Sequence, residues 1–206
     1  MAKSLVLSDE RLLGLQACDL FKGLSGHIMS QLVDNCSVEE VSKTEDIVIE
    51  GDNNMDMFVL SAGFALVHKQ EKGGKRIILD VCGAGDAVGY HALSGKTDRT
   101  ASVTALTVVK CVKVNARTLS EILFQSRRFL RNLVKENTRV INELDERLMA
   151  AAHKSNEAHL KLLNKRLAKL VTSFDGDYRK LPFKLTHETI ADYCGCSRET
   201  ITRFLS

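Results

Sequence analysis

The spacing of hydrophobic positions changes twice along this chain of 206 residues. Up to residue 36, apolar residues such as Leu12 and Leu15 recur at helical spacing, and Ser25 stands where a helix cap is needed, which predicts short helices. From residue 38 to about residue 114, short β-branched runs alternate with glycine-bearing turns. The runs cover residues 46–49, 57–60, 65–67, 76–79, 101–103 and 108–112. Short strands at even spacing predict an antiparallel sandwich or barrel.

A long helix is predicted from about Thr118 to beyond residue 150, because apolar positions return to helical spacing there. Within it, a seam advances by alternating steps of three and four residues. The seam residues are Val134, Asn137, Ile141, Leu144, Leu148, Ala151 and Ser155. The same helix of a second chain would cover this seam in a two-stranded coiled coil, so a homodimer is expected, with Asn137 setting the register. The alternative is a long helix packed on its own sheet.

Two short helices joined by a turn are predicted at residues 185–205. Thr186 and Ser197 stand at the two N-cap positions, and Gly195 lies in the turn, as in a helix-turn-helix. On a wheel of the second helix, the polar arc holds Arg198, Glu199, Thr202, Arg203 and Ser206, and the opposite arc holds Thr200, Ile201, Phe204 and Leu205. Arginine can donate to guanine and glutamate can accept from cytosine, so the polar arc suits G/C base pairs. A solvated amphipathic helix is the alternative.

Composition places the chain among ordinary globular proteins. Its hydrophobic content is 44%, its charged content 27% and its net charge +3, values that neither require nor exclude a nucleic acid partner. Basic residues gather toward the C-terminal end, where DNA phosphates would be met. They are Lys154, Lys161, Lys165, Arg166, Lys169, Arg179 and Lys180. Because no apolar run reaches about 18 residues and no signal sequence begins the chain, we expect a cytoplasmic protein without a membrane span.

The six cysteines are expected to be free thiols in a cytoplasmic protein. Cys194 and Cys196 are separated by one residue and have no second pair nearby, which is a poor arrangement for zinc. No nucleophile–base pair, paired carboxylates or phosphate-binding loop is visible in the sequence, so an enzyme is not expected.

The order of the elements and several motifs resemble the superfamily of the cyclic AMP receptor protein and the fumarate-nitrate regulator (Crp/Fnr), which are bacterial transcription factors. The resemblance covers almost the whole chain. Its most specific stretch is Gly195-Cys196-Ser197-Arg198-Glu199-Thr200 with Arg203. The motifs that look like turns and pocket segments of the β-roll are Ile49-Glu50-Gly51-Asp52, Ser61-Ala62-Gly63, Gly85-Asp86-Ala87-Val88-Gly89 and Arg99-Thr100-Ala101-Ser102-Val103.

This resemblance implies an α+β fold in three parts. An N-terminal antiparallel β-roll domain, similar to cyclic-nucleotide-binding domains, is expected at residues 1–117. A long dimerisation helix follows at residues 118–156, and a winged helix-turn-helix domain at residues 157–206. The chain stops at Ser206, inside the expected recognition helix, so we expect the wing to be absent from this sequence.

The resemblance also implies that a homodimer binds double-stranded DNA at a TGTGA-like inverted repeat and contacts RNA polymerase. Residues expected to contact DNA are Arg198, Glu199 and Arg203 at base edges, Thr186, Glu188 and Ser197 near the phosphate backbone, and Thr200 and Thr202 beside them. An effector bound in the β-roll would shift the packing of the dimer and thereby move the two recognition helices. The alternative from another class is a sensor domain that controls a partner protein without binding DNA.

The effector pocket implied by the resemblance consists of Gly89, Tyr90, Arg99, Thr100, Ala151 and Ala152. Gly89, Arg99 and Thr100 match the phosphate-holding positions of the cyclic AMP branch, and an arginine beside a hydroxyl suits a cyclic phosphate. Tyr90, however, stands where that branch has a glutamate for the ribose. Ala151 and Ala152 stand roughly where hydroxyl residues would reach the base. Cyclic AMP is therefore disfavoured as the effector.

A second interpretation of the pocket is haem with a gas such as carbon monoxide. His91 occupies a position that looks like the haem-ligating histidine of the carbon-monoxide-sensing branch, and imidazole is a usual ligand of haem iron. Candidates for a second ligand are His153, His159, Met149 and Cys82. The alternative is that His91 is a hydrogen-bonded structural residue. An iron–sulfur centre is not expected, because Cys18 and Cys36 are too few and too far apart.

Overall fold

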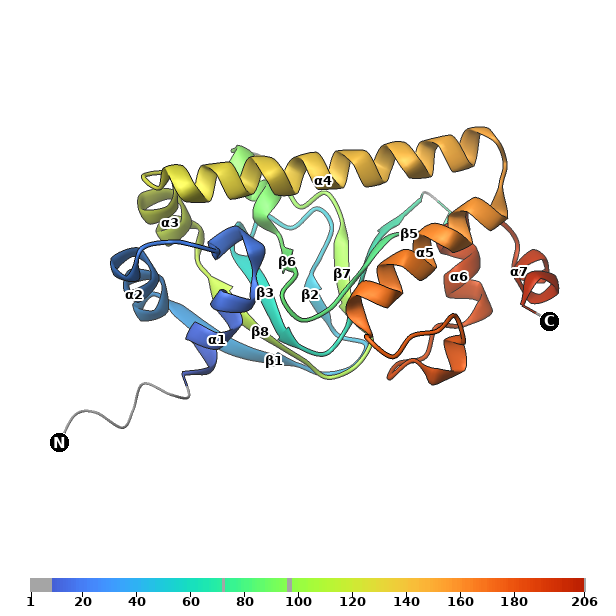
Figure 1. The fold of residues 1–206 in the computed structure, drawn as a ribbon, viewed down its shortest axis with the longest axis horizontal. Helices are drawn as coiled ribbons and strands as arrows, with labels where there is room; N and C mark the ends of the chain where they lie inside the picture. The colour runs from blue at the N-terminus through green and yellow to red at the C-terminus, as the bar shows by residue number, and fades with distance from the viewer. Residues whose placement is uncertain (1–8, 72, 96–97, 206) are drawn as a thin grey trace.

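The computed structural model describes residues 9–71, 73–95 and 98–205. Its strands form the centre of the molecule, with α4 (Arg127–Ala152) running along one side (Figure 1). The N-terminal helices lie at one end of the strands and the C-terminal helices at the other. Among the described residues, no helix has both the length and the hydropathy needed to cross a membrane.

In the described ranges, eight strands form two antiparallel four-stranded sheets, which together are called the β-roll below. The first sheet has the order β1-β8-β3-β6 and contains β1 (Cys36–Val41), β3 (Met57–Ala62), β6 (Ala87–Val88) and β8 (Val109–Val114). The second has the order β2-β7-β4-β5 and contains β2 (Asp46–Val48), β4 (Ala65–Gln70), β5 (Arg76–Cys82) and β7 (Ser102–Ala105). The antiparallel β-roll expected from the sequence is confirmed.

The hydrophobic pattern of the sequence did not predict β1 or β6. β1 lies at the edge of its sheet and is half exposed, so polar residues interrupt its hydrophobic alternation. β6 has only two residues and lies inside a segment that the sequence marked as a turn. Neither strand carries enough of a period-two signal to be recognised from the sequence alone.

Helices surround the β-roll, and most begin at a side-chain cap. The N-terminal helices are α1 (Glu10–Ala17), η1 (Asp19–Phe21) and α2 (Gly26–Asp34), and the expected Ser25 cap of α2 accepts from the Ile28 amide. Short helical turns follow the strands at η2 (Tyr90–Ser94), α3 (Ala116–Thr118) and η3 (Leu119–Leu123). The C-terminal helices are α5 (Asn156–Leu170), η4 (Tyr178–Lys180), α6 (His187–Cys194) and α7 (Arg198–Phe204).

The long helix α4 begins at Arg127 rather than at Thr118, so that boundary prediction was wrong. Ser126 is extended, with ψ at 107°, and its hydroxyl accepts a hydrogen bond from the Phe129 amide. A capping serine takes up an amide that has no partner inside the helix, which makes residue 126 a helix start. Thr118 instead belongs to the short turns that precede it.

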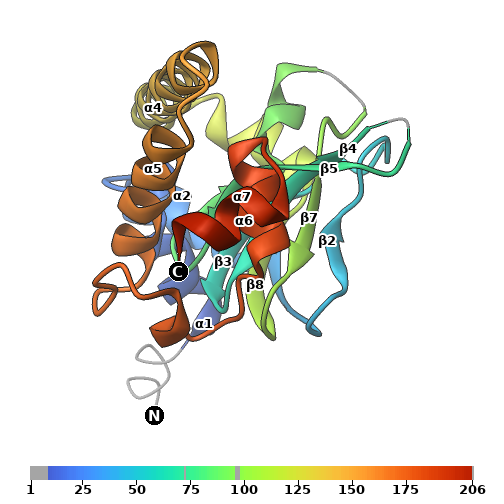
Figure 2. The same cartoon turned by 90° about the vertical axis from the view of Figure 1, so that its right-hand side faces the viewer.

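One hydrophobic core joins the β-roll to the C-terminal helices. Leu66 of β4 and Ile78 of β5 are buried together with Leu163 of α5, Ile190 of α6 and Ile201 of α7. Figure 2 shows α6 and α7 lying across the end of the molecule, beside α5. Shared burial of apolar side chains is the main favourable term in docking two such parts. The position of α6 and α7 therefore depends on the β-roll as well as on their own turn.

All six cysteines are free, as expected. Cys18, Cys82, Cys111 and Cys194 are buried, and burial raises the pKa of each of these thiols. Burial disfavours the thiolate, so these side chains behave as small apolar groups of the core.

Candidate DNA-reading surface and ligand cavity

The predicted helix-turn-helix is present, and its turn has the required hydrogen bonds. The Thr186 hydroxyl accepts from the Thr189 amide at 3.0 Å, and the Ser197 hydroxyl accepts from the Thr200 amide at 3.3 Å. Gly195 follows α6 with φ at 68° and ψ at 30°, the left-handed conformation in which glycine avoids strain. These local contacts determine where α6 and α7 begin and where α6 ends. The two helices and their turn form one unit, residues 186–205. The unit is called the reading unit below.

The buried side of the reading unit is narrower than the helical wheel predicted. Ile201 is completely buried, but Phe204 is 53% exposed and Leu205 is also exposed. The prediction that Phe204 and Leu205 pack inward was therefore wrong. Because α7 has only seven residues, a single turn of it faces the core formed by α6 and β5.

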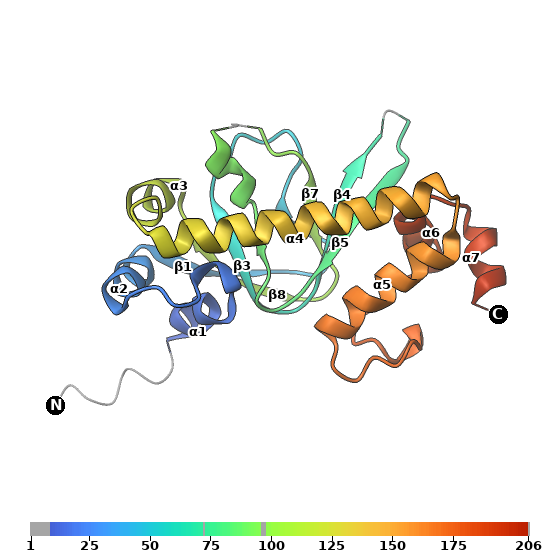
Figure 3. The ribbon, with the colours of Figure 1, turned by 45° about the horizontal axis from the view of Figure 1, so that its top comes forward.

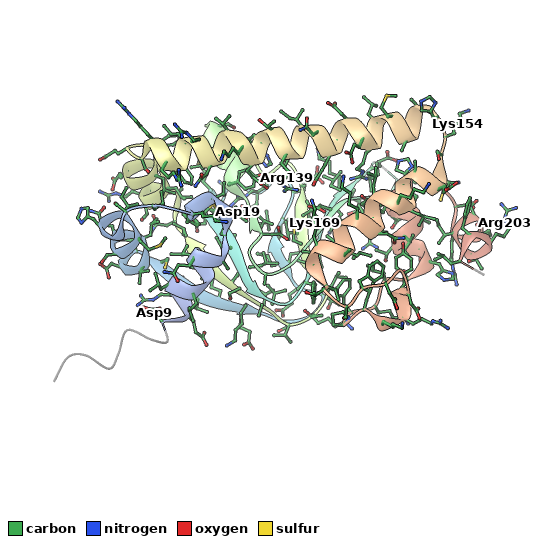
Figure 4. The ribbon with its side chains drawn as sticks, in the orientation of Figure 1. Asp9, Asp19, Arg139, Lys154, Lys169 and Arg203 are labelled. Carbon is green, nitrogen blue, oxygen red and sulfur yellow. The ribbon has the colours of Figure 1, made fainter. Side chains whose placement is uncertain are left out.

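The polar side of α7 faces solvent. Arg198, Glu199, Thr202 and Arg203 are all exposed, whereas Thr200 is half-buried. Arg203 lies on the outermost helix, at the end of the molecule opposite the N-terminus (Figure 4). The expected base-contacting residues therefore share one exposed surface. Thr186, Glu188 and Ser197 are also exposed near the starts of α6 and α7.

Glu199 interacts with the start of its own helix. Its own backbone amide, and then the Ser197 hydroxyl, hold the pKa of the Glu199 carboxyl below its ordinary value. The side chain is therefore ionised at neutral pH and is able to accept hydrogen bonds from a base. Because the Glu199 side chain is exposed, turning its carboxylate from the helix start toward a partner costs little free energy.

Thr202 makes contacts that sequence reasoning did not foresee. Its hydroxyl donates to the Arg198 carbonyl at 3.0 Å and lies 3.0 Å from Nδ1 of His187. The second contact joins the first residue of α6 to α7. No periodicity in the sequence signals such a pair, because it depends on how the two helices cross.

A cavity of about 450 Å³ lies between the β-roll, α4 and α5. The predicted pocket residues Gly89, Tyr90, Arg99 and Thr100 line it, as does His91. Figure 3 shows α4 passing across the strands, with α5 beside the C-terminal half of α4. Ala151 and Ala152 lie at the end of α4, away from the cavity lining, so the structure does not bring them to the other pocket residues.

Arg99 is the most enclosed basic residue of the cavity wall. Its Nη1 donates to the Gly89 carbonyl at 2.7 Å, and its Nη2 donates to the Asp56 carbonyl. Its Nε is buried and has no hydrogen-bond partner in the described part of the chain. Burial lowers the pKa of Arg99, yet an arginine remains charged in proteins. A buried cation with an unused donor is suited to an anionic ligand.

Gly89 permits this close approach. Its φ is 80°, and a Cβ there would lie 2.8 Å from Arg99 Nη1 and 2.9 Å from the Asp56 carbonyl oxygen. A side chain would therefore displace the arginine from its carbonyl partners. Beside it, Tyr90 is buried, and burial raises the pKa of its phenol, so the residue that replaces the glutamate of the resemblance is uncharged.

The part of the cavity between α4 and α5 is lined by paired charges that the sequence analysis missed. Arg139 donates to Glu136 at 2.6 and 2.9 Å and to Glu143 at 2.7 Å. On α5, Arg166 donates to Asp80 at 3.0 Å and to Asp86 at 2.8 Å. Figure 4 shows Arg139 on α4 and Lys169 on α5 in the region where the two helices face each other. The Arg166 pairs hold α5 against β5 and the loop that follows it, whereas the Arg139 pairs join residues within α4.

Arg147 links the cavity wall to the reading unit. It extends from α4, and its guanidinium donates to the carbonyls of Leu79, Ile78 and Tyr193, the latter two at 2.9 and 3.3 Å. The guanidinium also lies 4.4 Å from the centre of the Tyr193 ring. Since Leu79 and Ile78 belong to β5 and Tyr193 belongs to α6, one side chain connects three elements. Arg147, Leu79 and Tyr193 all line the cavity.

The described residues give no support to a haem site. His91 is exposed and its ring lies 4.5 Å from that of Tyr90. Of the second-ligand candidates, only Cys82 lines the cavity; Met149 and His153 are exposed on α4 and after it. His159 is buried, and its ring contacts the Ser155 carbonyl. Within the described ranges, no group of three or more His, Cys, Asp or Glu side chains could hold a metal ion.

The outer side of α4 carries the predicted seam. Asn137 is half-buried, and the apolar seam residues lie between 51% and 68% exposed in the single chain. They are Val134, Ile141, Leu144 and Leu148. An apolar stripe of this length on one helix is an uncommon surface for a monomer.

Comparison with known proteins gives consistent results for both halves of the chain. Residues 38–126 match the cyclic nucleotide-binding domain family, and residues 183–206 match the crp family of bacterial regulatory proteins. The CRP-like cAMP-activated global transcriptional regulator of Mycobacterium tuberculosis is 22% identical over 196 residues, which are 93% of this chain and 86% of that protein.

Solved structures show the same fold. The c-di-GMP-responsive global regulator CLP of Xanthomonas campestris superposes with a TM-score of 0.71 at 16% identity, covering 88% of this chain and 90% of that chain. A transcriptional regulator of the Crp/Fnr family from Eubacterium rectale has a TM-score of 0.70 at 20% identity and covers 92% and 86% of the two chains.

Proposed function

Since the chain belongs to the Crp/Fnr superfamily of transcription regulators and carries a cyclic nucleotide-binding domain, we propose that it acts as a homodimer that binds a TGTGA-like inverted repeat. A ligand in the cavity would control this binding. The observation that carries the DNA-binding part is the free polar side of α7, where Arg198, Glu199 and Arg203 are exposed while Ile201 anchors the helix in the core.

The α4 seam supports the homodimer. Four of its apolar side chains are more than half exposed, and pairing with the same helix of a second chain would remove them from water. A two-fold dimer presents two reading units, so each would meet one half-site of an inverted repeat about one helical turn apart.

The cavity supports a ligand that carries a phosphate. Arg99 offers a buried cation with an unused Nε donor, and Gly89 leaves room for the close backbone approach. The M. tuberculosis relative is named for activation by cAMP, and the X. campestris regulator for its response to c-di-GMP. Tyr90 and the remote Ala151 and Ala152 weigh against a cyclic AMP site like that of the receptor protein, so we propose the nucleotide class without favouring cyclic AMP.

Two measurements test these proposals separately. A gel-shift titration at fixed salt should give tighter binding to a TGTGA palindrome than to a scrambled duplex of the same composition, with two chains per duplex. Equal affinity for both duplexes would contradict the proposed site. Calorimetric titration with cyclic AMP, cyclic GMP and cyclic di-GMP tests the effector. If none of the three nucleotides gives a heat of binding, none of them is the effector.

The coupling between cavity and reading unit is proposed to run through Arg147. In an Arg147→Met variant, amide hydrogen exchange in β5 and α6 should become about 30-fold faster, because three hydrogen bonds and the ring contact that hold these elements together are lost. This corresponds to about 2 kcal/mol for hydrogen bonds from one charged group. Exchange in β1 and β8, on the other sheet, should remain unchanged.

The matched control is Arg131→Met, which removes an exposed arginine from the same helix. If exchange rose equally in β8 and in α6, Arg147 would be a general stability residue and the coupling proposal would fail. The Arg147→Met variant should also lose any change in DNA affinity that a bound nucleotide causes in the wild type, and the Arg131→Met variant should keep it.

A further inference from the structure

The cavity offers different chemistry at its two ends. Arg99 and Gly89 lie in the β-roll, where a phosphate is proposed to bind, whereas Glu143 of α4 and Lys169 of α5 line the part between the two helices. In the described part of the lining, α4 and α5 contribute only charged and apolar side chains, and no Asn or Gln. An ionised carboxylate only accepts hydrogen bonds and an ammonium only donates them, so this end is selective for the pattern of polar groups on a ligand.

The pair of Glu143 and Lys169 joins α4 to α5 beside the cavity. Lys169 Nζ lies 3.5 Å from Oε1 of Glu143, which is longer than an ordinary N–H···O hydrogen bond. Arg139 donates to the same Oε1 at 2.7 Å, and no described side chain donates to Oε2. Both side chains of the pair are partly exposed, so the pair itself contributes little stability. A ligand can therefore engage Oε2 and the ammonium while Arg139 stays in place.

The phosphate end of the cavity is connected to this pair along α4. Burial raises the pKa of the Tyr90 phenol, and the charge of Glu136 on α4 raises it further, so Tyr90 of the β-roll faces that helix. Glu136 and Glu143 both accept hydrogen bonds from Arg139, and all three residues line the cavity. Val140, also in the lining, adds an apolar surface on which the face of a base can lie.

The two purine bases differ in the order of polar groups along their Watson–Crick edges. Guanine presents the acceptor O6, then the donor N1–H and then the donor 2-amino group. An ammonium beside a carboxylate is complementary to this order, because the ammonium donates to O6 and the carboxylate accepts from the other two groups. Adenine presents a donor and then an acceptor, so its amino group would meet the ammonium and its N1 would meet the carboxylate.

We propose that the cavity selects a cyclic nucleotide with a guanine base, and that Glu143 and Lys169 read the edge of that base. The inference rests on the proposed nucleotide effector and specifies which base the effector contains. Glu143 accepts from N1–H and from the 2-amino group, and Lys169 donates to O6. Because the two residues belong to different helices, the bound base also connects α4 to α5.

The test uses the full chain in calorimetric titrations with two guanine ligands, cyclic GMP and cyclic di-GMP, and with their adenine counterparts. At least one guanine ligand should bind about 100-fold more tightly than its adenine counterpart, because adenine leaves both charged groups unpaired. The inosine counterpart of that ligand lacks only the 2-amino group and should bind about 10-fold more weakly, as expected for one hydrogen bond to a charged group. Comparison of the two guanine ligands distinguishes a mononucleotide from a dinucleotide.

Protein variants assign the two parts of the edge. Glu143→Gln should bind the guanine and inosine ligands about equally, because an amide has one accepting atom instead of two. Lys169→Met should weaken both ligands by the same factor, since both carry O6. The matched control is Glu146→Gln, because Glu146 also lines the cavity, one turn further along α4, and pairs with Lys165 of α5 at 3.4 Å. This control should keep the preference for guanine.

Three results would overturn the inference and leave the proposed nucleotide effector intact. The first is a guanine ligand that binds the wild type no more tightly than its adenine counterpart, a comparison that needs no variant to fold. The second is a preference for the 2-amino group that survives in Glu143→Gln, and the third is a preference that is lost in Glu146→Gln. If no cyclic nucleotide gives a heat of binding, the proposed effector fails and the inference fails with it.

Discussion

An Arg203→Ala variant is expected to bind its operator about 5- to 150-fold more weakly per half-site and to tolerate any base pair at one position of that half-site. The side chain is exposed on the polar side of α7, where nothing in the core would change on its removal. A bidentate contact between an arginine and guanine contributes about 1–3 kcal/mol of discrimination. Gel-shift titration of a panel of operators, each mutated at one position, measures both effects.

Arg127→Ala is the matched control, because Arg127 is an exposed arginine at the start of α4, remote from the reading unit. It removes the same charge, so it reports the contribution of net charge to DNA affinity. If the Arg203 variant still distinguished every mutated operator as the wild type does, Arg203 would not be a base-reading residue. A uniform loss across all operators would instead assign it to the phosphate backbone.

A Gly63→Ala variant is expected to lose about 2–5 kcal/mol of folding free energy. The turn between β3 and β4 holds Gly63 at a φ of 85°, and a Cβ would lie 2.2 Å from the Val108 carbonyl oxygen and 2.9 Å from the Val109 Cα. Both atoms belong to the backbone of the neighbouring chain segment, so no side chain can turn aside. The loss combines left-handed strain with overpacking of about 1–3 kcal/mol. Urea unfolding followed by circular dichroism measures it.

Gly51→Ala separates the two contributions. Gly51 has a similar φ of 82°, but a Cβ there would meet no atom within 4 Å. Only the left-handed strain remains, at about 1–2 kcal/mol. Equal destabilisation by the two substitutions would show that the close approach to Val108 carries no cost.

Several features followed from residues that are close together in the chain. Ser25, Thr186 and Ser197 were expected to cap helices, and all three do so through an amide three residues ahead. The glycine-bearing turns separate the strands as predicted, and Gly195 takes the left-handed conformation after α6. Such features are decided by hydrogen bonds and backbone sterics over a few residues, so the local sequence contains the necessary information.

The same local reasoning explains an error. Ser126 is a cap of the same kind, but the predicted long helix was drawn through it because apolar spacing continued on both sides. A helical spacing of apolar residues shows that a helix is favoured, but it does not show where one helix stops and the next one starts. Here the capping residue, Ser126, marks where α4 begins.

Local sequence was therefore enough to predict the broad succession of helices and strands, the starts of α2, α6 and α7, and the polar character of α7. Three features became visible only in the folded protein: Arg147 joins α4 to β5 and α6, His187 contacts Thr202, and Ala151 and Ala152 lie outside the cavity lining. The two groups of features differ in the range of the interactions that stabilise them. Caps and turns are satisfied within a few residues, whereas these contacts join separate elements and exist only once the helices have packed against the β-roll.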